Sequence, residues 1–147
     1  ADLIRTPVAI TGYNPAVNFD LKASVAYTGA ETCTVEGVTL QPGGVRATGS
    51  VHNFQVGFRA FGNGVQIDKP RVTHDIAQAS GAAAYIDGAY CSVTGLYAEK
   101  MGLLAYIAAT ATEAIAHNNS GRDITNGGAD GIDDAGPSSS LVNNTAI

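Results

Sequence analysis

Oxygen-bearing side chains are concentrated in one short segment of the chain. Five of them fall between residues 123 and 134, with glycines among them: Asp123, Asn126, Asp130, Asp133 and Asp134. Calcium takes roughly six to eight oxygen ligands, which a flexible loop of this composition can supply. The segment is therefore a candidate calcium site, although it lacks an Asp-x-Asp-x-Asp-Gly spacing. The alternative is an acidic, solvated loop held by Asx turns.

Two cysteines, Cys33 and Cys91, are too few for a zinc site and are not spaced as Cys-x-x-Cys. In an exported protein they would form one disulfide, closing a loop of roughly 59 residues and contributing about 3–4 kcal/mol on the chain-entropy model. The alternative is two buried, reduced cysteines. Ala1 fits either a cleaved signal peptide, which implies export, or a removed initiator methionine.

The three histidines do not have the spacing of a helical metal pair. His52 falls in a predicted strand, His74 at a predicted strand–helix junction and His117 at a predicted helix end. His74 and Asp75 could supply half of an acid–base pair, but no nucleophile accompanies them. No G-x-S-x-G, H-E-x-x-H or P-loop pattern occurs. The sequence predicts a protein that is not an enzyme and that has no cofactor, apart from the calcium candidate.

Composition restricts the classes of partner. The chain has 147 residues, which predicts one domain. Charged residues make up 14%, against about 25% in an average soluble protein, and the net charge is −5. Lysines and arginines are scattered singly, whereas binding to nucleic acid phosphates needs clustered positive charge. A surface with so little charge is easily covered by another protein surface.

The first half of the chain predicts β-structure. Apolar and polar side chains alternate over residues 17–27, as in a strand with one buried face. Further strands are expected over residues 31–40, 45–61 and 65–72, with turns at 41–44 and 62–64. Pro70 confines the last of these strands to an edge or ends it early. Strands joined in order by short turns predict an antiparallel meander, within a sandwich or an open sheet.

The second half predicts one long helix over residues 95–117, with Thr94 as its N-cap. Its apolar face is spaced by sevens and fours: Leu96, Leu103, Ile107, Ala111 and Ile115. The uncharged part of this segment is too short to span a membrane, which needs about 20 residues. A helix so apolar is expected to be buried on more than one side. Upstream, a short helix over residues 76–84 competes with a hairpin turning at Asp87-Gly88.

The expected fold is therefore α+β. One domain comprises a β-meander or sandwich over residues 17–72 and a helical or hairpin part over 73–120, flanked by extended arms at 1–16 and 121–147. In the second arm Leu141, Val142 and Ile147 are the expected anchors. No segment repeats at a fixed period of 20–50 residues, which argues against a solenoid.

These features predict a self-assembling structural subunit, either of an extracellular, pilus-like filament or of a virion, as a phage capsid or tail accessory protein. Its partners would be copies of itself or other subunits, bound through both arms and the apolar helix, with no nucleic acid and no membrane span. The location would be the cell surface, the extracellular space or a virion. The alternative is a secreted calcium- or carbohydrate-binding module. Against carbohydrate stand the absence of Trp and the positions of the six tyrosines, most of which fall on predicted core patterns.

Overall fold

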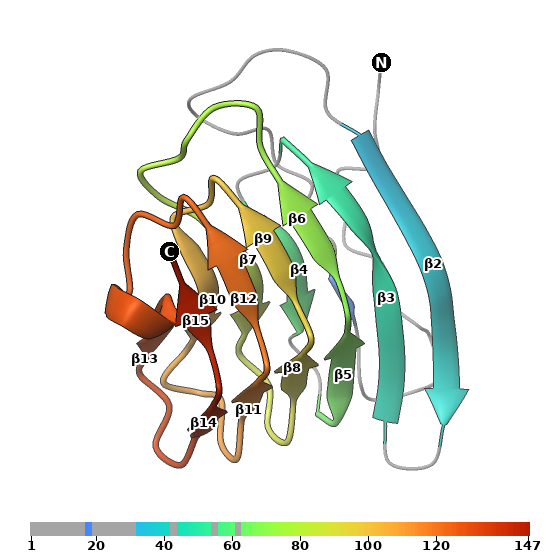
Figure 1. Ribbon diagram of the computed structural model, residues 1–147. Helices are drawn as coiled ribbons and strands as arrows, with labels where there is room; N and C mark the ends of the chain where they lie inside the picture. The colour runs from blue at the N-terminus through green and yellow to red at the C-terminus, as the bar shows by residue number, and fades with distance from the viewer. Residues whose placement is uncertain (1–16, 19–31, 42–43, 54–55, 61–62) are drawn as a thin grey trace.

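The computed structural model describes residues 17–18, 32–41, 44–53, 56–60 and 63–147. It is a β-solenoid of about 4 turns, built almost entirely from parallel strands. Figure 1 shows successive coils stacked side by side, from β3 at one end to β14 and β15 at the other. The predicted α+β class, with its antiparallel sandwich and long helix, is therefore wrong.

The described part of the chain contains fifteen strands and one 3-10 helix, joined by turns and loops. They are β1 (Val17–Asn18), β2 (Thr32–Gln41), β3 (Gly44–His52), β4 (Val56–Ala60), β5 (Val65–Asp68), β6 (Arg71–Thr73), β7 (Ala82–Ile86), β8 (Ser92–Thr94), β9 (Tyr97–Glu99), β10 (Leu103–Ile107), β11 (Ile115–His117), β12 (Ser120–Arg122), η1 (Gly128–Asp130), β13 (Ile132–Asp134), β14 (Ser140–Val142) and β15 (Thr145–Ala146).

Each coil contributes strands to three faces. The first face is β3–β5–β8–β11–β14 and the second is β3–β6–β9–β12–β15, with the long β3 bending across both. The third face is β4–β7–β10–β13. Antiparallel pairing occurs only at the N-terminal end of the described strands, where β2 pairs with β3 and β1 with β4.

The corners of the coils depend on left-handed backbone conformations that stack from coil to coil. Between the first and second faces the corner residues are Lys69, Gly95, Asn118 and Asn143, with φ between 51° and 66°. Gly and Asn adopt this region more readily than other residues do. Each such residue turns the chain sharply between two short strands, which keeps every strand in register with the coil before it.

Inside the coils, small and branched apolar side chains fill a narrow core. The largest fully buried side chains are Phe58, Ile67, Ile86, Leu96, Met101, Leu104, Ile107 and Gln78. Alanines occupy much of the remaining interior, including Ala83, Ala84 and Ala105. Small side chains let three strand layers approach one another closely, which a solenoid of this cross-section requires.

The segment predicted as a helix over residues 95–117 is instead a corner, strands β9 and β10, a loop and strand β11. Leu96, Ile107 and Ala111 are buried as expected, but Ile115 is exposed and Leu103 half-buried. Short strands separated by corners bring apolar side chains inward every three or four residues, which imitates a helical period. The described residues include no helix long and apolar enough to cross a membrane.

The predicted C-terminal arm, residues 121–147, is also wrong, because this segment completes one coil and begins the next. The Ser140 amide donates to the Ala114 carbonyl over 2.8 Å, and the Thr145 amide donates to the Asn119 carbonyl over 2.9 Å. The tail is therefore held by its own domain. The predicted N-terminal arm, residues 1–16, lies outside the described residues, as does most of the strand expected over 17–27.

Two other expectations also need correction. The Asp87-Gly88 turn leads from β7 on the third face to β8 on the first, so it does not close a hairpin. The repeat was missed because its length varies. The equivalent positions Arg46, Gln66, Ser92, Ile115 and Ser140 lie 20, 26, 23 and 25 residues apart.

Candidate functional site

A column of side chains crosses the third face. Arg59, Tyr85, Tyr106 and Asp133 occupy matching register positions on β4, β7, β10 and β13. The Tyr85 and Tyr106 rings have centroids 4.9 Å apart and are tilted by 37°. The Arg59 guanidinium lies 5.0 Å from the centre of the Tyr85 ring and donates to Asp87 Oδ2 over 2.8 Å. The half-exposed rings are thereby fixed in orientation at the surface.

Two adjoining hollows lie beside this column, and together we call them the groove. The smaller hollow, about 190 Å³, is largely apolar and is lined by Val56, Gly81, Ala82, Tyr85, Leu103 and Tyr106. The larger hollow, about 400 Å³, is lined by Ala79, Ser80, Gly81, Leu103, Asn126, Gly127, Ile132 and Asp133. Gly81 and Leu103 line both hollows, so the two hollows are continuous.

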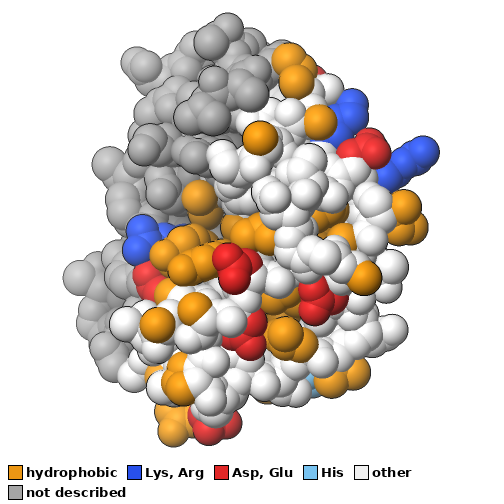
Figure 2. Space-filling model, turned by 90° about the vertical axis from the view of Figure 1, so that its left-hand side faces the viewer, with side chains coloured by type: hydrophobic (Ala, Val, Ile, Leu, Met, Phe, Trp, Pro, Cys, Tyr) orange, Lys and Arg blue, Asp and Glu red, His pale blue; other side chains and the backbone are white. Residues whose placement is uncertain are grey.

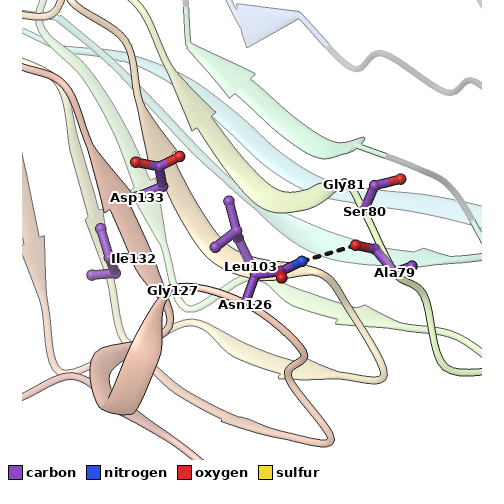
Figure 3. A pocket seen from close by; sticks show the side chains of 8 residues that line it. All are labelled: Ala79, Ser80, Gly81, Leu103, Asn126, Gly127, Ile132 and Asp133. Carbon is purple, nitrogen blue, oxygen red and sulfur yellow. Dashed lines mark hydrogen bonds between the residues drawn. The ribbon is translucent and has the colours of Figure 1, made fainter.

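Two loops form the walls of the larger hollow, and side chains join them. Asn126 Nδ2 donates to the Ala79 carbonyl over 2.8 Å, as Figure 3 shows, and Thr125 Oγ1 donates to the Gln78 carbonyl over the same distance. These bonds link residues 78–79 of one coil to residues 125–126 of a later loop. The hollow is therefore held open by fixed walls.

The other end of the 75–81 loop is anchored to the last residue of β3 and the residue that follows it. His52 Nε2 lies 3.1 Å from Asp75 Oδ1, and Asn53 Nδ2 donates to Asp75 Oδ2 over 3.1 Å. The Lys100 ammonium donates to the Asp75 carbonyl over 3.0 Å. Asp75 thus pairs with His52, and the acid–base pair considered for His74 and Asp75 is not formed.

His74 itself is buried, and neither ring nitrogen has a hydrogen-bond partner among the described residues. Burial lowers the pKa of His74 to about 4, with a further lowering from His52 that Asp75 partly opposes. His117 lies elsewhere, on the first face, with Nε2 2.9 Å from Ser140 Oγ. The histidines therefore do not converge on the groove.

The five residues of the calcium candidate are spread over the last loops. Asp130 accepts from the Ile132 amide over 3.2 Å, and Asp134 accepts from the Gly136 amide over 2.9 Å. Asn126 and Asp133 line the groove, while Asp123 occupies a left-handed corner. In the described part of the chain no three His, Cys, Asp or Glu side chains are grouped so that they could hold a metal ion.

Cys91 is buried, with Sγ 3.5 Å from the Ala89 carbonyl. The side chain of Cys33 lies outside the described residues, so the Cys33–Cys91 disulfide stays a prediction. Cys91 is not among the described residues that line the groove.

Sequence reasoning missed the tyrosine pair, because most of the six tyrosines were expected to fall on core patterns. Neither is buried, nor is Tyr97, and Tyr90 is 67% exposed. Tyr13 and Tyr27 lie outside the described residues. One signal could have found the pair: Ala-Tyr-Ile occurs at residues 84–86 and again at 105–107. In a solenoid these triplets lie on neighbouring strands.

No family model matches the chain, no curated protein resembles it significantly, and no solved structure does.

Proposed function

We propose that this chain is a non-catalytic binding module for an extended saccharide, which lies along the groove on the third face. The observation that carries the proposal is the Tyr85–Tyr106 pair, two partly exposed rings 4.9 Å apart that line the smaller, apolar hollow. This hollow adjoins the larger one, which is lined by Ser80, Asn126 and Asp133 among others. Rings present an apolar face for the C–H side of a sugar, while the neighbouring polar groups meet its hydroxyls.

The rigidity of the groove supports this proposal. Both rings stand on strands that are paired on each side, since β7 lies between β4 and β10 and β10 between β7 and β13. The facing loops are joined by the Asn126–Ala79 hydrogen bond. A site that is already ordered loses little conformational entropy when it binds a ligand.

The absence of catalysis is part of the proposal and rests on the carboxylates. Glycoside hydrolysis generally uses a pair of carboxyl groups on either side of the scissile bond. Among the described residues that line the two hollows, Asp133 alone carries a carboxylate. Nearby Asp87 is half-buried and bound by Arg59.

The test is glycan binding by the full chain, measured by titration calorimetry against a panel of soluble oligosaccharides. Tyr85→Ala and Tyr106→Ala should each weaken binding by about tenfold, since a stacked ring contributes about 0.5–1.5 kcal/mol beyond its buried area. Tyr97→Ala is a matched control: Tyr97 is also half-exposed and lies 4.7 Å beneath an arginine, but on the second face. Equal losses in all three variants, or no binding to any glycan, would refute the proposal.

A second candidate is the self-assembling structural subunit of a filament or virion, outside the cell or on its surface. It is favoured by the end of the solenoid at which β13, β14 and β15 are edge strands of the described sheets. Leu141, Val142 and Ile147 are 36%, 52% and 82% exposed there. Figure 2 is turned toward this end and shows hydrophobic side chains across its middle, with acidic side chains among them.

Edge strands offer unpaired backbone groups to another chain, so this end could bind a further copy. Light scattering over a range of concentrations tests this second candidate. Assembly that weakens in Val142→Lys would support it, because a charge on an edge strand opposes pairing. A monomer at every concentration would count against it and would leave saccharide binding unaffected.

A further inference from the structure

Two polar side chains of the larger hollow, Asp133 and Asn126, offer acceptor oxygens to a ligand, and one of them carries a negative charge, which restricts the class of saccharide. This inference rests on the proposed function and concerns the same site. Asp133 is exposed, lines the larger hollow and has no hydrogen bond or ion pair with the described residues. Its neighbour Asp134 is different, because Oδ1 accepts from the Gly136 amide and from Ser139 Oγ. Asp133 is thus the carboxylate left for a ligand.

Asn126 adds a second acceptor. Its Nδ2 donates to the Ala79 carbonyl over 2.8 Å and to Thr125 Oγ1 over 3.4 Å. The carbonyl can only accept, which fixes the nitrogen on that side and leaves Oδ1 on the other. Both amide hydrogens are engaged, so the atom that Asn126 can offer to a ligand is Oδ1.

No lysine, arginine or histidine is among the described residues that line either hollow. The nearest cation of the column, Arg59, donates through Nε and Nη2 to Asp87 Oδ2. Nothing positive in the described lining would offset the desolvation of an anionic sugar. The carboxylate of Asp133 would instead repel it.

We propose that the groove selects amino-sugar oligosaccharides. Their ammonium groups would bind Asp133, their hydroxyls would donate to Asn126 Oδ1, and their C–H faces would lie on Tyr85 and Tyr106. Neutral oligosaccharides keep the last two contacts and bind more weakly. Oligomers of uronic acids keep the stacking surface but place like charges beside Asp133.

The experiment titrates the full chain with glucosamine, glucose and galacturonate oligomers of equal length, at a mildly acidic pH where the amines are charged. Glucosamine oligomers should bind most tightly and galacturonate oligomers most weakly, and added salt should narrow the difference. Asp133→Asn should reduce the preference for glucosamine over glucose oligomers by about three- to tenfold, in line with the strength of charge-assisted hydrogen bonds. Affinity for glucose oligomers should change little.

Asp123→Asn is the matched control. It removes the same charge from an exposed residue at a left-handed corner, which Asn tolerates, and Asp123 does not line the groove. Equal effects of the two variants, or equal binding of galacturonate oligomers, would overturn the selectivity while saccharide binding stands. If none of the three oligomers binds at millimolar concentration, the selectivity fails, and the proposed function fails as well only if the glycan panel also shows no binding.

Discussion

Asn119 Nδ2 donates a hydrogen bond to Asn144 Oδ1 over 2.9 Å, from one coil to the next. Asn119 is almost fully buried, and its Oδ1 accepts from the Leu96 amide on the coil below. Asn144 Nδ2 in turn donates to the Ala116 carbonyl over 2.8 Å. This asparagine ladder satisfies backbone groups at a corner where strand pairing is interrupted.

Replacing Asn119 should therefore be costly. Asn119→Ala leaves the Leu96 amide and the Val93 carbonyl without their side-chain partner, and we expect a loss of about 2–3 kcal/mol in the free energy of unfolding. Asn144→Ala should cost about 1 kcal/mol, because Asn144 is only half-buried. Denaturant unfolding measures both losses. Equal losses of unfolding free energy in the two variants would show that the deeper burial of Asn119 does not increase its contribution to stability.

Gly102 has no room for a side chain. A Cβ there would lie 2.6 Å from the Gly81 carbonyl oxygen and 2.9 Å from Ser80 Cα, both in the loop that forms the groove wall. Gly102→Ala should thus displace this loop, destabilise the fold by more than about 2 kcal/mol and weaken ligand binding. Gly128→Ala is the control: it has open space but a φ of 66°, so strain of about 1 kcal/mol is expected without an effect on binding.

His74 should make stability depend on pH. Its pKa in the folded state is about 4, below the usual value of 6.5, so the fold favours the neutral ring. The stability associated with this difference is complete above pH 6.5 and is lost as the pH falls toward 4. His74→Leu should remove this loss of stability at low pH. Relative to the unmodified chain, the free energy of unfolding of the variant should be higher at pH 5 than at pH 7.5 by about 1–3 kcal/mol, which melting curves at the two pH values would detect. An equal shift at both pH values would contradict this assignment.

Truncation should reveal how far the last loops support the core. Removing residues 121–147 takes away Gly121 and Gly131, which lie against the buried Leu104 side chain. Exposing Leu104 alone should cost about 1.5–3 kcal/mol. Removing only residues 138–147 should cost less, because β12 and β13 remain. Thermal unfolding followed by circular dichroism gives the melting temperatures of the two truncated chains. An unchanged melting temperature after the longer deletion would show that residues 121–147 do not stabilise the core around Leu104.

Local patterns predicted the β-structure of the first half of the described chain better than its arrangement. The strands expected over residues 31–40 and 65–72 correspond to β2 and to β5 with β6. The direction of pairing could not be read locally, because a parallel neighbour lies 20 or more residues away. The alternation of one buried and one exposed side chain is the same in both kinds of sheet.

The helix predicted in the second half of the chain was wrong for a different physical reason. Leu96, Met101, Leu104 and Ile107 are all buried in one core, although the first two lie in the connections before and after β9 and the last two on β10. Their spacings resemble those of a helix. Gly95 and Gly102 were the contrary signal, since glycine is a poor helix former. The groove could be predicted less well still, because its lining comes from four coil segments whose relation depends on the solenoid.

The column on the third face has a direction. It runs from the Arg59 guanidinium across two tyrosine rings to the Asp133 carboxylate, one side chain from each successive strand. Its two ends differ, because the arginine is already paired with Asp87, whereas the carboxylate of Asp133 is exposed. An elongated ligand with a cationic group at one end would therefore lie along the column in one orientation and be disfavoured in the reverse.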